Sequence, residues 1–158
     1  MNTSLILCLA FAIGVIAGLR SLTAPAVVCW AAHLGWINLH GSHLALLGST
    51  VTVVVVTLLA IFELINDKLP ATPSRTTPGP LGARIVMGAL CGAALVIGGG
   101  QGVALGAIAG IVGAVVGTFG GYQARHQIVT KLKVKDIGVA LMEDLIAIGG
   151  ALLIVTRF

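Results

Sequence analysis

Charged residues are too scarce in this chain to cover a water-facing surface. Only 9% of its 158 residues are Asp, Glu, Lys or Arg, and 58% are hydrophobic, whereas roughly a quarter of a soluble domain is charged. This composition excludes an ordinary soluble enzyme, a disordered chain and a nucleic-acid-binding domain. The aromatic content of 4% also argues against a transmembrane β-barrel, which carries aromatic girdles. The remaining class is a bundle of transmembrane helices.

Apolar segments divide the chain into five predicted spans and one shorter segment, since a crossing needs about 20 residues. The spans are residues 4–19, 44–65, 85–97, 102–121 and 137–156. The sixth segment, 24–37, is either a tilted span or a re-entrant helix, with Thr23 as its expected N-cap and Pro25 in its first turn. The fold class is therefore all-α, a polytopic membrane bundle forming one integral-membrane domain over residues 1–158.

Positive charge gathers in two predicted loops, residues 66–84 and 122–136. Their basic residues are Lys68, Arg75, Arg84, Arg125, Lys131, Lys133 and Lys135. Two spans separate the segments, so both lie on one side of the membrane, which the positive-inside rule makes cytoplasmic. No Lys or Arg precedes the first apolar segment, so we expect it to be a retained helix and not a cleaved signal. The expected location is the inner membrane.

Glycine follows a helical pattern in three of the apolar segments. The positions at steps of three or four are Gly14 and Gly18, Gly88 and Gly92, and Gly102, Gly106, Gly110, Gly113, Gly117 and Gly120. Such positions share one helix face, and small residues there let helix backbones approach closely. The pattern predicts glycine-rich helix packing, either within one chain or at an oligomer interface or pore.

Two adjacent acids, Glu143 and Asp144, lie about seven residues inside the last span, roughly 10 Å deep at 1.5 Å per residue. Ionisable residues are costly in a bilayer and mark functional sites. Neighbouring helical side chains point about 100° apart, so we expect one carboxylate to face inward. The pair is either a proton or cation site or a structural ion pair with Arg84, Arg125 or Lys135.

Glu63 and Asp67 are four residues apart and therefore share a helix face near the cytoplasmic end of 44–65. Negative charge opposes the dipole at a helix C-terminus, so these acids need cations. The expected partners are the nearby Lys68, Arg75 and Arg84, in a structural cluster or a gate. Arg20, between two apolar segments, either snorkels to the interface or binds an anion or carboxylate at a helix break.

Three motifs resemble a known family of bacterial membrane proteins. They are Gly18-Leu19-Arg20-Ser21-Leu22-Thr23, Glu63-Leu64-Ile65-Asn66-Asp67-Lys68-Leu69-Pro70, and Glu143-Asp144-Leu145-Ile146-Ala147. In this order they resemble the family catalogued as domain of unknown function 4126. The resemblance implies the membrane architecture and no particular activity.

These features favour a small oligomeric protein that moves an ion or a proton-coupled solute. Its candidate ion-binding residues are Glu143, Asp144, Glu63, Asp67 and Arg20. The alternative is a non-transporting accessory or scaffold subunit of a larger membrane complex. No pairing of nucleophile and base points to an enzyme, and no ligand spacing points to a metal or cofactor. The expected partners are the lipid bilayer and further membrane protein chains, not nucleic acid.

Overall fold

The computed structural model describes residues 2–67, 74–132 and 136–158. Its helices are α1 (Thr3–Leu19), α2 (Thr23–His33), α3 (Thr50–Asn66), α4 (Pro78–Gly98), α5 (Val103–Leu132) and α6 (Asp136–Val155), with a 3-10 turn η1 (Ala45–Gly48) before α3. The described residues form no β-strand. The predicted all-α class is therefore confirmed.

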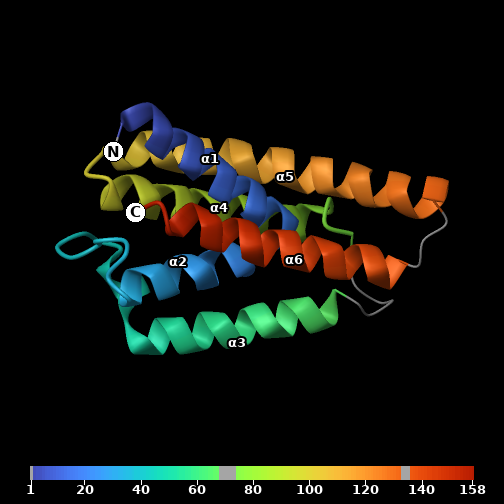
Figure 1. Ribbon diagram of the computed structural model, residues 1–158, viewed down its shortest axis with the longest axis horizontal. Helices are drawn as coiled ribbons and strands as arrows, with labels where there is room; N and C mark the ends of the chain where they lie inside the picture. Colours follow the sequence, from blue (N-terminus) through green and yellow to red (C-terminus); the bar gives the residue numbers. More distant parts are fainter. Residues whose placement is uncertain (1, 68–73, 133–135) are drawn as a thin grey trace.

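Successive helices run in opposite directions along the bundle (Figure 1). Both termini lie at one end, together with the segment between α2 and α3 and the turn between α4 and α5. The end of α3, the start of α4, the end of α5 and the start of α6 lie at the other end, which we call the α5–α6 end. α2 follows this alternation with only 11 residues, about 16 Å at 1.5 Å per residue.

The helices α1, α4 and α5 pack against one another through glycine. A Cβ atom added at Gly14 of α1 or at Gly88 of α4 would meet the backbone of Gly110 on α5, and one at Gly92 would meet Gly106. The predicted packing glycines with such backbone or side-chain contacts are Gly14, Gly18, Gly88, Gly92, Gly106, Gly110, Gly113 and Gly117. Their faces are occupied by helices of the same chain. Gly102, by contrast, has open space where a Cβ would lie.

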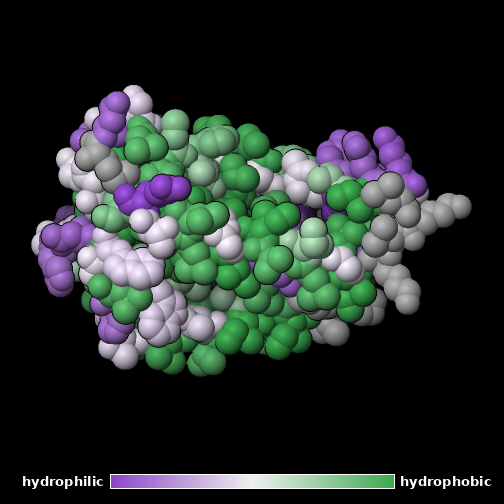
Figure 2. Space-filling view, viewed as in Figure 1, coloured by the Kyte–Doolittle hydropathy of each residue, from purple (hydrophilic) through white to green (hydrophobic). Residues whose placement is uncertain are grey.

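Large apolar side chains cover the outside of the bundle. On the face that Figure 2 shows, hydrophobic residues cover the middle of the molecule and hydrophilic residues lie mostly toward its two ends. Three helices, α4, α5 and α6, are long and apolar enough to cross a membrane, and α1 and α3 are shorter apolar helices of 17 residues each. These apolar helices indicate a membrane protein, because soluble proteins rarely expose apolar surfaces of this extent to water.

Two helices are longer than the sequence predicted. α4 begins at Pro78 and not near residue 85, because proline is tolerated in the first helical turn, where its missing N–H has no partner to lose. α5 continues through the basic segment to Leu132, so most of 122–136 is helix and not loop. That stretch contains no Gly or Pro after residue 121 to end the helix. Hydropathy marks where the apolar part of α5 ends, near residue 121, whereas the helix itself continues into the polar sequence as far as Leu132.

Candidate functional site

Arg20 ends α1 as its C-cap residue, and its side chain is completely buried. It donates a hydrogen bond through Nη1 to Asp67 Oδ2 at the end of α3. Its Nη2 lies 2.7 Å from Asp144 Oδ1 on α6. One guanidinium group therefore joins three helices, as bidentate arginine geometry allows. The predicted alternative of a snorkelling Arg20 is wrong, and the predicted carboxylate contact at the helix break is present.

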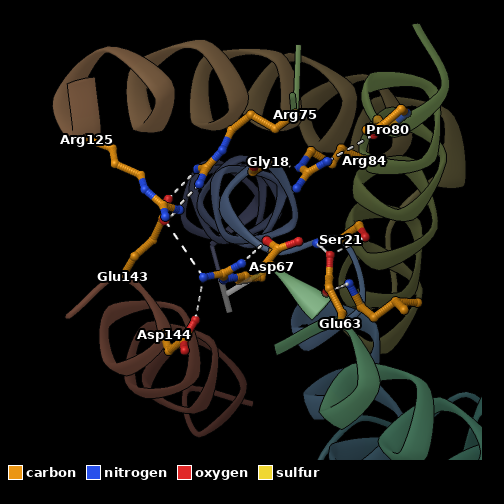
Figure 3. A network of polar contacts seen from close by, with 12 residues as sticks. Gly18, Ser21, Glu63, Asp67, Arg75, Pro80, Arg84, Arg125, Glu143 and Asp144 are labelled. Carbon is orange, nitrogen blue, oxygen red and sulfur yellow. Dashed lines mark hydrogen bonds and ion pairs between the residues drawn. The ribbon is translucent and has the colours of Figure 1, made fainter. Parts of the chain in front are cut away.

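Glu143 lies between further guanidinium groups at the same end of the bundle (Figure 3). Arg75, in the segment before α4, donates to both of its carboxylate oxygens, with 2.9 Å between Nη2 and Oε2. Arg125 Nη1 of α5 lies 3.7 Å from Oε2, and Arg20 Nη2 lies 3.9 Å from the same atom. Glu143 and Asp144 are both buried, so the expectation that only one of them faces inward is wrong.

The two acids share the interior because their partners approach from different helices. Asp144 reaches Arg20 at the end of α1, whereas Glu143 reaches Arg75 and Arg125. The 100° between neighbouring side chains thus places each carboxylate at a different part of one charged cluster. Of the predicted partners, Arg125 contacts Glu143, whereas Arg84 contacts main-chain oxygens instead.

Glu63 binds the start of α2. Its Oε1 accepts hydrogen bonds from the backbone N–H of Ser21, at 2.8 Å, and from the Ser21 hydroxyl, and its Oε2 accepts one from the N–H of Leu22, at 2.8 Å. A carboxylate is stabilised at a helix N-terminus by free N–H groups and by the helix dipole. The expected N-cap role of Thr23 is therefore wrong: Leu22 is the N-cap, and the capping oxygens come from α3.

Side chains of α4 and α5 donate hydrogen bonds to a main-chain carbonyl at the C-terminal end of α1. The Gly18 carbonyl accepts hydrogen bonds from Arg84 Nε at 3.1 Å and from the Thr118 hydroxyl at 3.2 Å. Arg84 also donates to the Pro80 carbonyl at 3.3 Å. At the break between α1 and α2, the negative end of α1 therefore contacts hydrogen-bond donors, and the positive end of α2 contacts a carboxylate. Helix termini inside a membrane require such partners.

Every acidic residue of the chain belongs to this charged cluster. The five Asp and Glu residues are Glu63, Asp67, Asp136, Glu143 and Asp144, and the guanidinium groups among them are those of Arg20, Arg75, Arg84 and Arg125. Asp136, at the start of α6, accepts two hydrogen bonds from Arg125, at 2.8 and 2.7 Å. We call these nine residues the charge network; Lys68, predicted to belong to it, lies outside the described residues.

Two buried polar groups at the break between α1 and α2 have unused hydrogen-bonding capacity. Arg20 Nε and the Thr23 hydroxyl are buried and have no hydrogen-bond partner among the described residues. Most buried polar groups in proteins are paired, so such atoms mark positions where a further polar group can bind.

Two cavities adjoin the charge network at the α5–α6 end. The larger, of about 420 Å³, has apolar walls from α1, α5 and α6 and includes Arg125 and Glu143. The smaller, of about 210 Å³, is lined by Tyr122, Arg125, His126, Val129 and Asp136. Glu143 therefore contacts both the ion pairs and an open volume of the size that holds a small ligand.

Sequence reasoning missed three members of this site. Asp136 is 11 residues from Arg125 and belongs to the next helix, and the opposite charges of the pair were the available signal. Ser21 donates to Glu63 through both its backbone N–H and its hydroxyl, and the sequence does not single out a backbone donor. Thr118 resembles any apolar-helix threonine, and nothing in its neighbourhood indicates a contact with a residue 100 positions earlier.

The family model described as Domain of unknown function (DUF4126) matches residues 7–157. This range contains the helix break and the whole charge network. Comparison with curated proteins and with solved structures found no match. The match spans nearly the entire chain, and the chain belongs to the family described as Domain of unknown function (DUF4126).

Proposed function

We propose that this protein moves a small ion or a proton-coupled solute through a membrane, using the charge network as its binding site. The observation that carries the proposal is the position of Glu143, which lies among three arginines and also lines the 420 Å³ cavity. The interrupted α1–α2 pair supports it, because transporters commonly build their sites where helices break inside the membrane.

Occupancy of Glu143 would change the packing of the bundle. Arg75, Arg125 and Arg20 reach this carboxylate from three different parts of the chain. A proton or cation on Glu143 removes the attraction that holds these groups to α6, since ion pairing needs the ionised form. Binding is thereby coupled to the separation of α6 from its neighbours, which is the two-state element that coupled transport requires. The buried, unpartnered Arg20 Nε and Thr23 hydroxyl supply further contacts for a solute.

We also propose an inner-membrane location, with the α5–α6 end toward the cytoplasm. The basic residues of segments 66–84 and 122–136 support this orientation through the positive-inside rule. A six-segment topology follows from it, with α2 as the short segment. A bundle of this size has little interior for a pathway, so we further propose self-association.

Proton flux into proteoliposomes tests the transport proposal. We expect the wild-type protein to dissipate an imposed pH gradient, or to carry Na⁺ or K⁺ under a membrane potential, faster than protein-free vesicles. Glu143→Gln should slow this flux by about tenfold or more, because a charge-assisted contact contributes about 1.5–3 kcal/mol and each 1.4 kcal/mol is a factor of ten.

All five acids lie in the charge network, so no other acid can serve as the control for Glu143→Gln. The control is therefore Arg157→Gln, which changes an exposed charged residue next to the C-terminus, at the opposite end of the bundle. Its flux should equal that of the wild type. Equal flux in wild-type, Glu143→Gln and protein-free vesicles would contradict the transport proposal.

The outward face of α3 favours a second candidate function, that of an accessory subunit in a larger membrane complex. α3 packs against α2 and η1, and it leaves Val54, Leu58, Ile61, Phe62 and Ile65 exposed. Purification in native lipid discs separates the two functions. A foreign subunit present in fixed proportion supports the accessory role, and a complex of this chain alone contradicts it.

A further inference from the structure

The larger cavity lies where the end of α5 and the beginning of α6 flank an apolar space. Its α5 wall comes from Gly121, Ala124 and Ile128, and its α6 wall from Val139, Met142 and Ile146. Because glycine and alanine occupy the α5 side, the two helices leave a volume of about 420 Å³ between them. Such a volume suits a hydrocarbon chain, since its walls are apolar apart from Arg125 and Glu143.

Arg125 connects this apolar cavity to a polar one. The α5 residues of the apolar cavity are at positions 121, 124, 125 and 128, and those of the polar cavity are at 122, 125, 126 and 129. The two sets are neighbouring faces of one helix, displaced by one residue or about 100°, and Arg125 belongs to both. A molecule that fills both cavities must therefore pass the guanidinium group of Arg125.

The chemistry around Arg125 fits an anionic group. His126 lines the polar cavity, and the exposed Lys131 lies in the last turn of α5. Arg125 is paired with Asp136, whose side chain is 61% exposed, and lies 3.7 Å from Glu143 Oε2. The exposed side of the Arg125–Asp136 pair is open to a phosphate group, which can share the guanidinium with these carboxylates. Phosphate also matches the bidentate donors of arginine.

We infer that this site binds an anionic phospholipid of the surrounding membrane, with one acyl chain in the apolar cavity and its phosphate at Arg125 in the polar cavity. The inference stands apart from the transport proposal, because it needs no movement of the bound molecule. Anionic lipids are attracted by basic residues near the membrane surface, and Lys133 and Lys135, which lie outside the described residues, add charge to the same segment of the sequence.

Native mass spectrometry of the purified protein, titrated with phosphatidylglycerol or phosphatidylcholine of the same acyl chains, tests the inference. We expect phosphatidylglycerol to bind at least about tenfold more tightly, the factor that one charge-assisted contact provides. Arg125→Gln should reduce its affinity to that of phosphatidylcholine. Ala124→Leu, which fills the apolar cavity while keeping Arg125, should weaken phosphatidylglycerol binding while the protein stays folded.

The control is Arg157→Gln, which removes one positive charge from the opposite end and should leave the preference unchanged. Inorganic phosphate should not displace the lipid, because it lacks the chain that fills the apolar cavity. Equal binding of the two lipids by the wild type, an unchanged preference in Arg125→Gln, an unchanged phosphatidylglycerol affinity in Ala124→Leu, or displacement by phosphate alone would each overturn the inference.

Discussion

Replacing Arg20 with glutamine is expected to destabilise the folded bundle by about 3–5 kcal/mol, the range found when one partner of a buried ion pair is removed. The Arg20 side chain is 0% exposed, and it contacts Asp67 of the α3 end and Asp144 of α6. In Arg20→Gln both carboxylates, which are largely buried, lose the guanidinium group that they share. The α1–α2 break, which Arg20 joins to α3 and α6, should then open first.

Buried cysteines provide the readout for Arg20→Gln. Cys29 and Cys91 are buried and Cys8 is exposed, so a Cys8→Ser background leaves thiols that react with a fluorescent probe only as the bundle opens. Unfolding is followed with this probe during a denaturant titration in detergent. Arg157→Gln, which removes an exposed arginine, should match the background. The stability of Arg20→Lys should lie between those of Arg20→Gln and the background, because lysine keeps the positive charge but lacks the two-pronged guanidinium group. An Arg20→Gln protein as stable as Arg157→Gln would show that the ion pairs contribute nothing.

The second large effect is expected from Gly110→Ala on α5. A Cβ atom at this position would meet the carbonyl oxygen of Gly88, would lie 2.8 Å from the carbonyl carbon of the same residue and 3.3 Å from the Cα of Gly92. These are backbone atoms, so no side-chain rotation relieves the contact and α4 must move away from α5. Overpacking costs about 1–3 kcal/mol, and a backbone obstacle places this variant at the upper end of that range.

Gly120→Ala is the matched control for Gly110→Ala. Gly120 lies on the same helix, but a Cβ there meets nothing within 4 Å. Alanine favours a helix over glycine by up to about 1 kcal/mol, so this variant should be as stable as the wild type or slightly more so. The same thiol assay measures both. If the two variants lose equal stability, close backbone approach between α4 and α5 is not what holds these helices together.

Much of the helix pattern could be predicted because hydropathy and glycine spacing are local properties. The apolar segments at 4–19 and 137–156 lie within one residue of α1 and α6, and the glycine positions predicted close helix contacts. The beginning of α4 and the end of α5 could not be predicted from hydropathy, because the helical hydrogen bonds continue into polar sequence. There Pro78 and the stretch from Tyr122 to Leu132 form helix outside the predicted spans.

All residues of the charge network except Asp136 could be predicted, but most of the pairings could not. The free-energy cost of an ionisable side chain in the bilayer singles out five residues individually: Glu143, Asp144, Glu63, Asp67 and Arg20. Arg75 and Glu143 are 68 residues apart, and Arg20 and Asp67 are 47 apart, so their contacts depend on how helices pack and not on local spacing. The cation expected for Glu63 proved to be the N-terminus of α2, because backbone N–H groups carry partial charge that the sequence letters do not display.

A double-mutant cycle between Arg20 and Asp144 tests most directly whether the charge network holds the interrupted α1–α2 pair to the rest of the bundle. The unfolding free energies of Arg20→Gln, Asp144→Asn and the double variant are compared with the Cys8→Ser background. Since Nη2 and Oδ1 are 2.7 Å apart, we predict a coupling energy of about 2–3 kcal/mol, at the upper end for residues in contact. Losses that add to within about 0.5 kcal/mol would contradict the account.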